Sequence, residues 1–296
     1  MVNLAEVAGR THEVASAMDE AKNVLVRAER VLGEQEVDHA LTRRLSDVQS
    51  LADSAERVSA LEQDASRKRQ AAATGKDVAQ SDEADRALVS AFSNSVGEAA
   101  NIPSALRETW EDLADLRDRL DRSSKHLGTA AEHADALDRM PEYDGDKNLL
   151  ANVRGVKGVV DKAHEAVADV VERVEAVRTI TSRFEQDPRH LRSGQMAEQI
   201  TSTSSRLRGE LVAAQNRVRE AHGPVVANKS AVEKATQQAI DGAVAAKDAE
   251  RDAKDLTKSV QAATNPTPRD QQVQSSSQEE LRRRLDGPAQ EAGVQR

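Results

Sequence analysis

The stretch from Leu149 to Phe184 constrains the fold most, because apolar residues return along it every three or four positions. Seven of its eleven stripe positions are valine, and valine costs a helix about 0.5 kcal/mol relative to alanine. Burying seven valines would contribute on the order of 10 kcal/mol, which outweighs roughly 3–4 kcal/mol of lost helix propensity. The stretch therefore predicts a helix that is stable only when packed against others. Its stripe is Leu149, Val153, Val156, Val160, Ala163, Val167, Val170, Val174, Val177, Thr181 and Phe184.

Five other stretches carry apolar residues at the same spacing, which is typical of helices in bundles and coiled coils. They cover residues 4–32, 37–65, 106–134, 196–218 and 232–263.

Glycine and proline predict where these helices end. We expect Gly33 to be a left-handed C-cap that turns the first two helices into an antiparallel hairpin. Breaks are also expected at 97–103 and at Gly223-Pro224. Alanine and glycine in the stripe of 232–263, and two glycines within 155–158, predict close approach of neighbouring backbones.

The fold class predicted is all-α: an elongated antiparallel helical bundle or coiled coil of about five to six long helices, with a disordered C-terminal tail. Only 1% of the residues are aromatic, too few for the thick core of an ordinary globular enzyme of this length. The expected divisions are an N-terminal helical hairpin (1–75), a short helix and linker (76–102), a long-helix bundle core (103–263) and the tail (264–296).

The net charge and the lack of targeting signals limit the expected partners and cellular location. The net charge is −9 and there is no cysteine, which argues against nucleic-acid binding and excludes disulfides and thiolate metal sites. The N-terminal residues lack the features of a signal peptide, and no long uncharged apolar run occurs. We therefore expect a soluble, cytoplasmic protein, with secretion that needs no signal peptide as the alternative.

The sequence patterns that resemble metal-binding sites are incomplete. Asp144, Asp146 and Asn148 alternate like calcium ligands, but the later glycine and glutamate of a calcium loop are missing, so a helix cap is expected. His126 and His133 are seven residues apart, whereas helical zinc pairs use a spacing of four. No catalytic residue, cofactor site or metal site is predicted, and we expect the protein not to be an enzyme.

Two basic runs, 67–69 and 282–284, follow acidic residues and lack aromatic neighbours for stacking on bases. Nucleic-acid binding is therefore not expected.

The function expected is that of a scaffold or protein-interaction module acting through long helical surfaces, with unknown protein partners and possible homo-oligomers. Alternatives are a protein lying on a membrane surface, against which the even mixing of charges argues, and a secreted or phage-derived helical module. For the first four interface residues, completing the bundle core is an equal alternative. The predicted interface residues are Val159, Val171, Ile240, Val244, Leu281 and Leu285.

Overall fold

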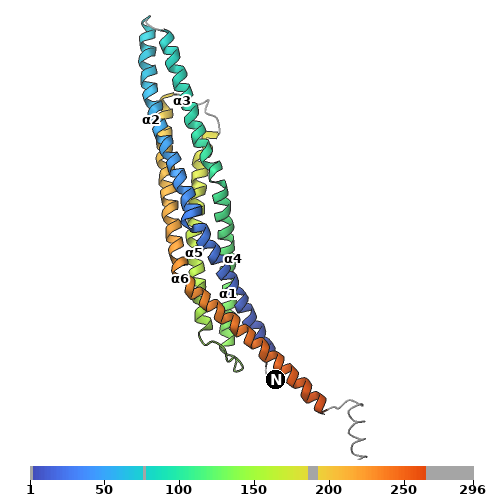
Figure 1. Cartoon of the computed structure of the whole chain (residues 1–296). Coiled ribbons are helices and arrows are strands. Elements are labelled where there is room, and N and C mark those ends of the chain that lie inside the picture. Colours follow the sequence, from blue (N-terminus) through green and yellow to red (C-terminus); the bar gives the residue numbers. More distant parts are fainter. Residues whose placement is uncertain (1–2, 76–77, 186–192, 265–296) are drawn as a thin grey trace, which may run out of the picture.

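The computed structural model describes residues 3–75, 78–185 and 193–264. These ranges contain six α-helices, one short π-helix and no strand. The long helices pack side by side as an elongated bundle (Figure 1), so the predicted all-α helical bundle is confirmed. Residues 265–296 of the predicted tail lie outside the described residues. The elements are α1 (Leu4–Leu32), η1 (Glu34–Asp38), α2 (His39–Ala73), α3 (Val78–Ala105), α4 (Arg107–Leu137), α5 (Leu149–Glu185) and α6 (Ser193–Thr264).

The helices form four long rods, two of which are made of successive helices. The first rod is α1, η1 and α2, which follow one another in the same direction, and α3 and α4 return beside it (Figure 1). α5 and α6 are the other two rods. α6 packs against α1, α2 and α5, so it contacts both halves of the first rod.

The expected hairpin of the first two helices is wrong. α1 packs against α4 and α6, while α2 packs against α3 and α6. Gly33 has φ −65° and ψ 163°, an extended conformation and not a left-handed one. An added Cβ at Gly33 would lie 3.1 Å from the Glu29 carbonyl oxygen, so this close backbone contact favours glycine. The π-helix starts at the next residue with Val37 buried, which leaves too few non-helical residues for a reversal.

Two expected breaks are continuous helix. α3 runs through 97–103 with Pro103 near its end, and α6 runs through Pro224 over 72 residues. A proline removes one helix hydrogen bond and crowds the carbonyl four residues before it. Ala221 and Val225, on either side of Pro224, are both buried, and this packing keeps the helix intact. The last two predicted helices are therefore one.

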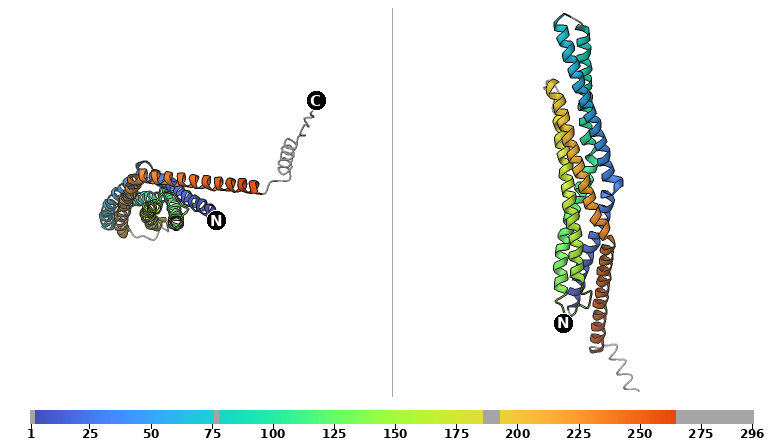
Figure 2. Two further views of the ribbon diagram at one scale, coloured as in Figure 1. Left: turned by 90° about the horizontal axis from the view of Figure 1, so that it is seen from below. Right: turned by 90° about the vertical axis from the view of Figure 1, so that its left-hand side faces the viewer.

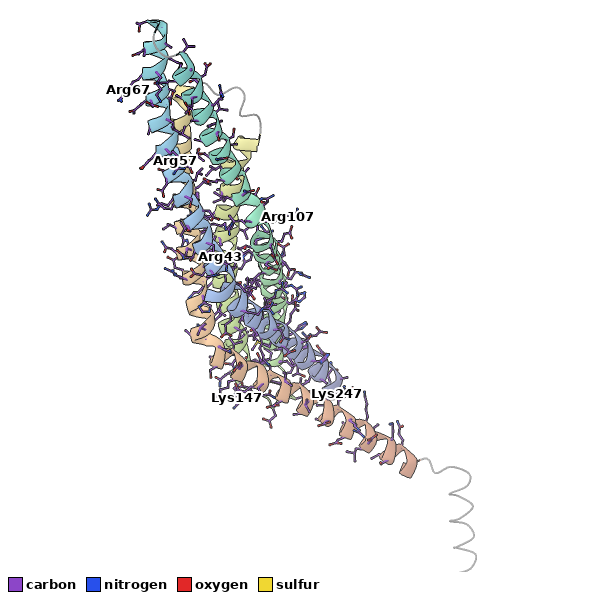
Figure 3. The ribbon with its side chains drawn as sticks, turned by 45° about the horizontal axis from the view of Figure 1, so that its top comes forward. Arg43, Arg57, Arg67, Arg107, Lys147 and Lys247 are labelled. Atoms are coloured by element: carbon purple, nitrogen blue, oxygen red, sulfur yellow. The ribbon has the colours of Figure 1, made fainter. Side chains whose placement is uncertain are left out.

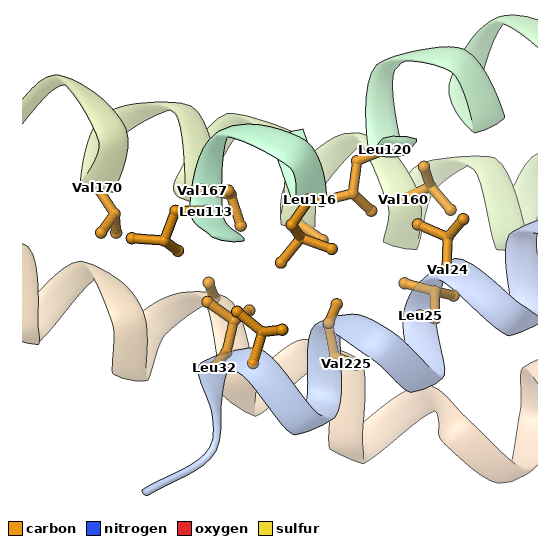
Figure 4. Close-up of a cluster of buried hydrophobic side chains, with 14 of the residues drawn as sticks. Val24, Leu25, Leu32, Leu113, Leu116, Leu120, Val160, Val167, Val170 and Val225 are labelled. Atoms are coloured by element: carbon orange, nitrogen blue, oxygen red, sulfur yellow. The ribbon is translucent and has the colours of Figure 1, made fainter. Parts of the chain in front are cut away.

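The core runs along the inside of the rods. All ten stripe positions of α5 whose side chains are described are buried, as the spacing predicts. The polar one, Thr181, donates its hydroxyl to the Val177 carbonyl oxygen at 3.0 Å, so burial leaves no unpaired group. Side chains from α1, α4, α5 and α6 converge in Figure 4: Val24, Leu25, Leu32, Leu113, Leu116, Leu120, Val160, Val167, Val170 and Val225.

Close backbone approach at the glycines is not observed. A Cβ added at Gly155, Gly158 or Gly242 would meet no atom within 4 Å. The two glycines of α5 lie beside the buried stripe and not within it, and Gly242 lies near the end of the bundle. Their expected packing role is therefore wrong.

Charged side chains cover the outer faces of the rods (Figure 3) and also fix their register. Lys229 pairs with Glu29 at 2.9 Å, and Arg219 lies 3.5 Å from Asp38. The two acids are nine residues apart and their partners ten apart in the opposite direction, so α6 keeps one antiparallel register along α1 and α2. Among the described helices, none is long and apolar enough to cross a bilayer.

Candidate interaction surface

α6 runs past the end of the bundle next to the N-terminus of α1 (Figures 1 and 2). Thr236 donates its hydroxyl to the Met18 carbonyl oxygen at 3.4 Å. Continuing this antiparallel register puts Leu4, the first residue of α1, beside about residue 250 of α6. Since α6 ends at Thr264, its last turns extend beyond α1. We call residues 251–264 the overhang.

The apolar stripe of α6 continues into the overhang, where its side chains are exposed. Val232 of the stripe is buried, whereas Leu256 is 67% exposed and Val260 is 56% exposed. Within 251–261, only Ala253 is partly buried. The expectation that the whole stripe of 232–263 is packed is therefore wrong for the overhang. The reason is that α1, which covers the stripe upstream, begins only at Leu4.

A row of aspartates runs along one flank of this exposed stripe. At about 100° per residue, Asp248, Asp252 and Asp255 lie on the same side of the helix. Asp255 pairs with Lys258 at 3.3 Å. Asp248 and Asp252 have no ion-pair or hydrogen-bond partner among the residues that the structure describes. Like charges four apart destabilise a helix by about 0.2–0.5 kcal/mol, so a cation docking from outside would relieve this repulsion.

The basic residues of the segment lie on another side of the helix. Lys247, Arg251, Lys254 and Lys258 follow one another at helical spacing. Lys254 pairs with Glu250 of the preceding turn. The segment 247–261 therefore has an apolar, an acidic and a basic face.

A groove of about 570 Å³ lies between α1 and α6 just before the overhang. Small residues of α1, including Gly9 and Ser16, form one wall, and Ile240 and Val244 form part of the other. Val244 is 56% exposed. Its direction differs from that of Leu256 by about 120° around the helix, so the groove and the stripe are separate surfaces.

The residues predicted for an interface lie in different places. Val171 is 5% exposed and belongs to the core, and Val159 is partly buried and packs against it. Ile240 is also partly buried, whereas Val244 is exposed beside the groove. The two leucines of 279–285 lie outside the described residues. The structure therefore does not join the four described members into one surface.

The loop before α5 is a helix cap. Asp146 Oδ1 accepts a hydrogen bond from the Asn148 backbone N–H at 2.9 Å, and Oδ2 accepts one from Asn152 Nδ2 at 3.1 Å. Both carboxylate oxygens are thus used at the start of the helix, where negative charge is favourable. This confirms the predicted capping role.

The two histidines of α4 face different partners on α1. His126 Nδ1 lies 2.7 Å from Glu20 Oε2, and His133 Nδ1 lies 3.2 Å from Arg10 Nη1. Within the described part of the chain, no group of three or more His, Cys, Asp or Glu residues is arranged to hold a metal ion. These histidines therefore link two rods.

Tyr143, in the loop before α5, is half-buried, and its phenol is expected to lose its proton at a higher pH than an exposed tyrosine. Burial, together with the negative charges of Asp146 and Asp138, raises its pKa to about 12, against about 10 for an exposed tyrosine. Because the neutral phenol is favoured in the fold, its contribution to stability is fully present below pH ~10. That contribution is lost as the pH rises toward about 12.

Gly145→Ala should lower the Tyr143 pKa toward the value of a free phenol. An added Cβ would lie 2.3 Å from Tyr143 Cζ, so the ring must move outward. The chain has one tyrosine, and ultraviolet titration therefore reports this phenol alone. Gly155→Ala, where an added Cβ meets nothing within 4 Å, is the control that should leave the titration unchanged. An unchanged titration in Gly145→Ala would show that the ring does not contact Gly145.

Sequence periodicity missed the overhang because it assigns residues to a face without saying what covers them. Length gives no signal either, because the stripe of 232–263 is about as long as the 29 residues of α1.

Comparison of this chain with family models, curated proteins and solved structures finds no match.

Proposed function

We propose that this protein is a non-enzymatic scaffold that binds other proteins through the overhang of α6. The four rods pack together as one bundle, and the overhang presents an amphipathic helix at one end of it. Binding would bury the exposed stripe against an apolar helix face of a partner, which is a common mode of helix recognition. We place the protein in the cytoplasm, with secretion as a folded module as the alternative.

The observation that carries the proposal is the continuation of the stripe beyond its cover. Leu256 is the large apolar side chain most exposed among the described residues. Burying one leucine stabilises a complex by about 1.5–3 kcal/mol. The exposure of Leu256 within a regular apolar stripe is therefore best explained by a partner that covers it.

A role on membrane surfaces is less well supported. The segment 247–261 carries four acidic and four basic residues, so its net charge is zero. Helices that lie on anionic bilayers combine an apolar face with an excess of Lys and Arg.

The test is photo-crosslinking in cells that make the protein. Benzoylphenylalanine in place of Leu256 should give adducts with another protein or with a second copy of the chain. The same residue in place of Arg251, on the basic face, should give much less. Mass spectrometry of the adducts identifies the partner and separates links between chains from links within one chain.

The absence of adducts between chains at position 256, or equal amounts at both positions, would contradict the proposal. Helical circular dichroism of both variants must match that of the parent, since the comparison requires an intact α6.

A further inference from the structure

We infer that residues 279–285 of this chain dock onto the overhang of α6 and cover its apolar stripe. Leu281 and Leu285 are four residues apart and would lie on one face of a short helix. Three consecutive arginines separate them. The two leucines would contact the exposed apolar stripe, and the arginines beside them would lie next to the aspartate row.

The chain is long enough for this return. From Thr264 to Leu281 there are seventeen residues, which can span up to about 56 Å. Going back along α6 from Thr264 to Asp248 needs only about 24 Å. A segment that returns along the helix from which it emerges would dock antiparallel to it. Tethering of this kind corresponds to an effective concentration of about millimolar, so weak contacts suffice.

The charges favour this occupant. Asp248 and Asp252 are without an ion-pair or hydrogen-bond partner in the described ranges. In a helical segment, Arg282 and Arg284 flank the Leu281 and Leu285 face on its two sides. One of these arginines would therefore lie beside the aspartate row when the leucines contact Leu256.

A second copy of the overhang fits this surface less well. If two overhangs paired antiparallel, the same flank of each helix would meet, and the two aspartate rows would face each other. If they paired parallel, the aspartate flank would face the flank of Glu250 and Thr257, where Lys254 is already paired with Glu250. Neither arrangement brings an unpaired cation to the aspartate row, whereas residues 279–285 carry three arginines against two glutamates.

Docking of 279–285 would make the proposed interaction surface self-covering, a consequence that rests on the proposed function. A partner would then have to displace the segment. Its apparent affinity would equal its affinity for the open stripe multiplied by the fraction of chains in which the stripe is open.

The experiment is a distance measurement between two spin labels in the purified full chain. Because the chain has no cysteine, Ser259→Cys, close to the direction of Leu256 around the helix, and Gln278→Cys can be labelled without removing any native thiol. We expect a narrow short-distance component. Leu281→Asp with Leu285→Asp should abolish it, while Lys247→Glu with Arg251→Glu, on the basic face, should leave it unchanged.

Charge reversal distinguishes specific docking from nonspecific hydrophobic association. Asp248→Arg with Asp252→Arg should reduce the short-distance component, and adding Arg282→Glu with Arg284→Glu should restore it. Circular dichroism confirms that the helices are retained in each variant.

A broad distribution that the leucine substitutions do not alter would overturn the inference. A short distance that also arises between singly labelled chains would assign the segment to a second copy and would equally overturn docking within one chain. Because the purified chain is studied alone, these results do not depend on whether the photo-crosslinking finds a partner.

Discussion

Leu116→Ala is expected to lower the free energy of unfolding by about 2–5 kcal/mol, the range found when a fully buried leucine is truncated. Leu116 on α4 is 0% exposed and lies between Leu113 and Leu120 where α1 and α5 meet it (Figure 4). The loss combines the transfer of a smaller side chain with the cavity that remains. Urea unfolding followed by helical circular dichroism measures it.

The same substitution in the overhang is the matched control. Leu256 is 67% exposed, so Leu256→Ala should change the free energy of unfolding by no more than about 0.5 kcal/mol. Equal losses in the two variants would show that Leu256 is packed against the helical bundle, which contradicts the exposure from which both proposals start.

The helical stripe of α5 could be predicted because it is long and its period is regular. Every described member is buried, including Thr181, whose hydroxyl bonds to its own helix. A spacing of three and four residues over ten turns leaves only one face on which these side chains can lie. Periodicity of this length therefore decides both the helix and its buried face.

The order of the rods could not be predicted in the same way. Gly33 suggested a reversal because glycine commonly ends helices in a left-handed conformation. Here it is extended, and α2 continues along α6 from where α1 stops. Whether two successive helices fold back or run on depends on which neighbour they share, and a local signal such as one glycine does not contain that information.

The candidate surface was only partly predictable for a related reason. Val244 was expected near an interface and is exposed, while Val171 was named with it and is in the core. Both lie at the edge of an apolar face, where exposure depends on how closely the next helix approaches. Leu256 lies at the centre of a face and is exposed because α1 is too short to cover it.

Pro224→Ala is expected to raise the free energy of unfolding by about 1–3 kcal/mol, because proline is about 3 kcal/mol less favourable than alanine inside a helix. α6 is continuous through this position. Alanine would restore one backbone hydrogen bond and remove the contact of the ring with the preceding turn. Part of this gain is offset because proline restricts the unfolded chain. Thermal and urea unfolding of the two proteins give the difference.

Gly223→Ala tests the same helix without proline chemistry. An added Cβ at Gly223 meets no atom within 4 Å, so alanine should stabilise by up to about 1 kcal/mol through helix propensity. If the chain turned at Gly223-Pro224, as local sequence alone suggests, replacing these two residues would remove the turn formers and destabilise the fold. The two models thus predict opposite signs at two adjacent residues. Stabilisation at both would mean that tertiary packing of Ala221 and Val225 carries α6 through a sequence that favours a break.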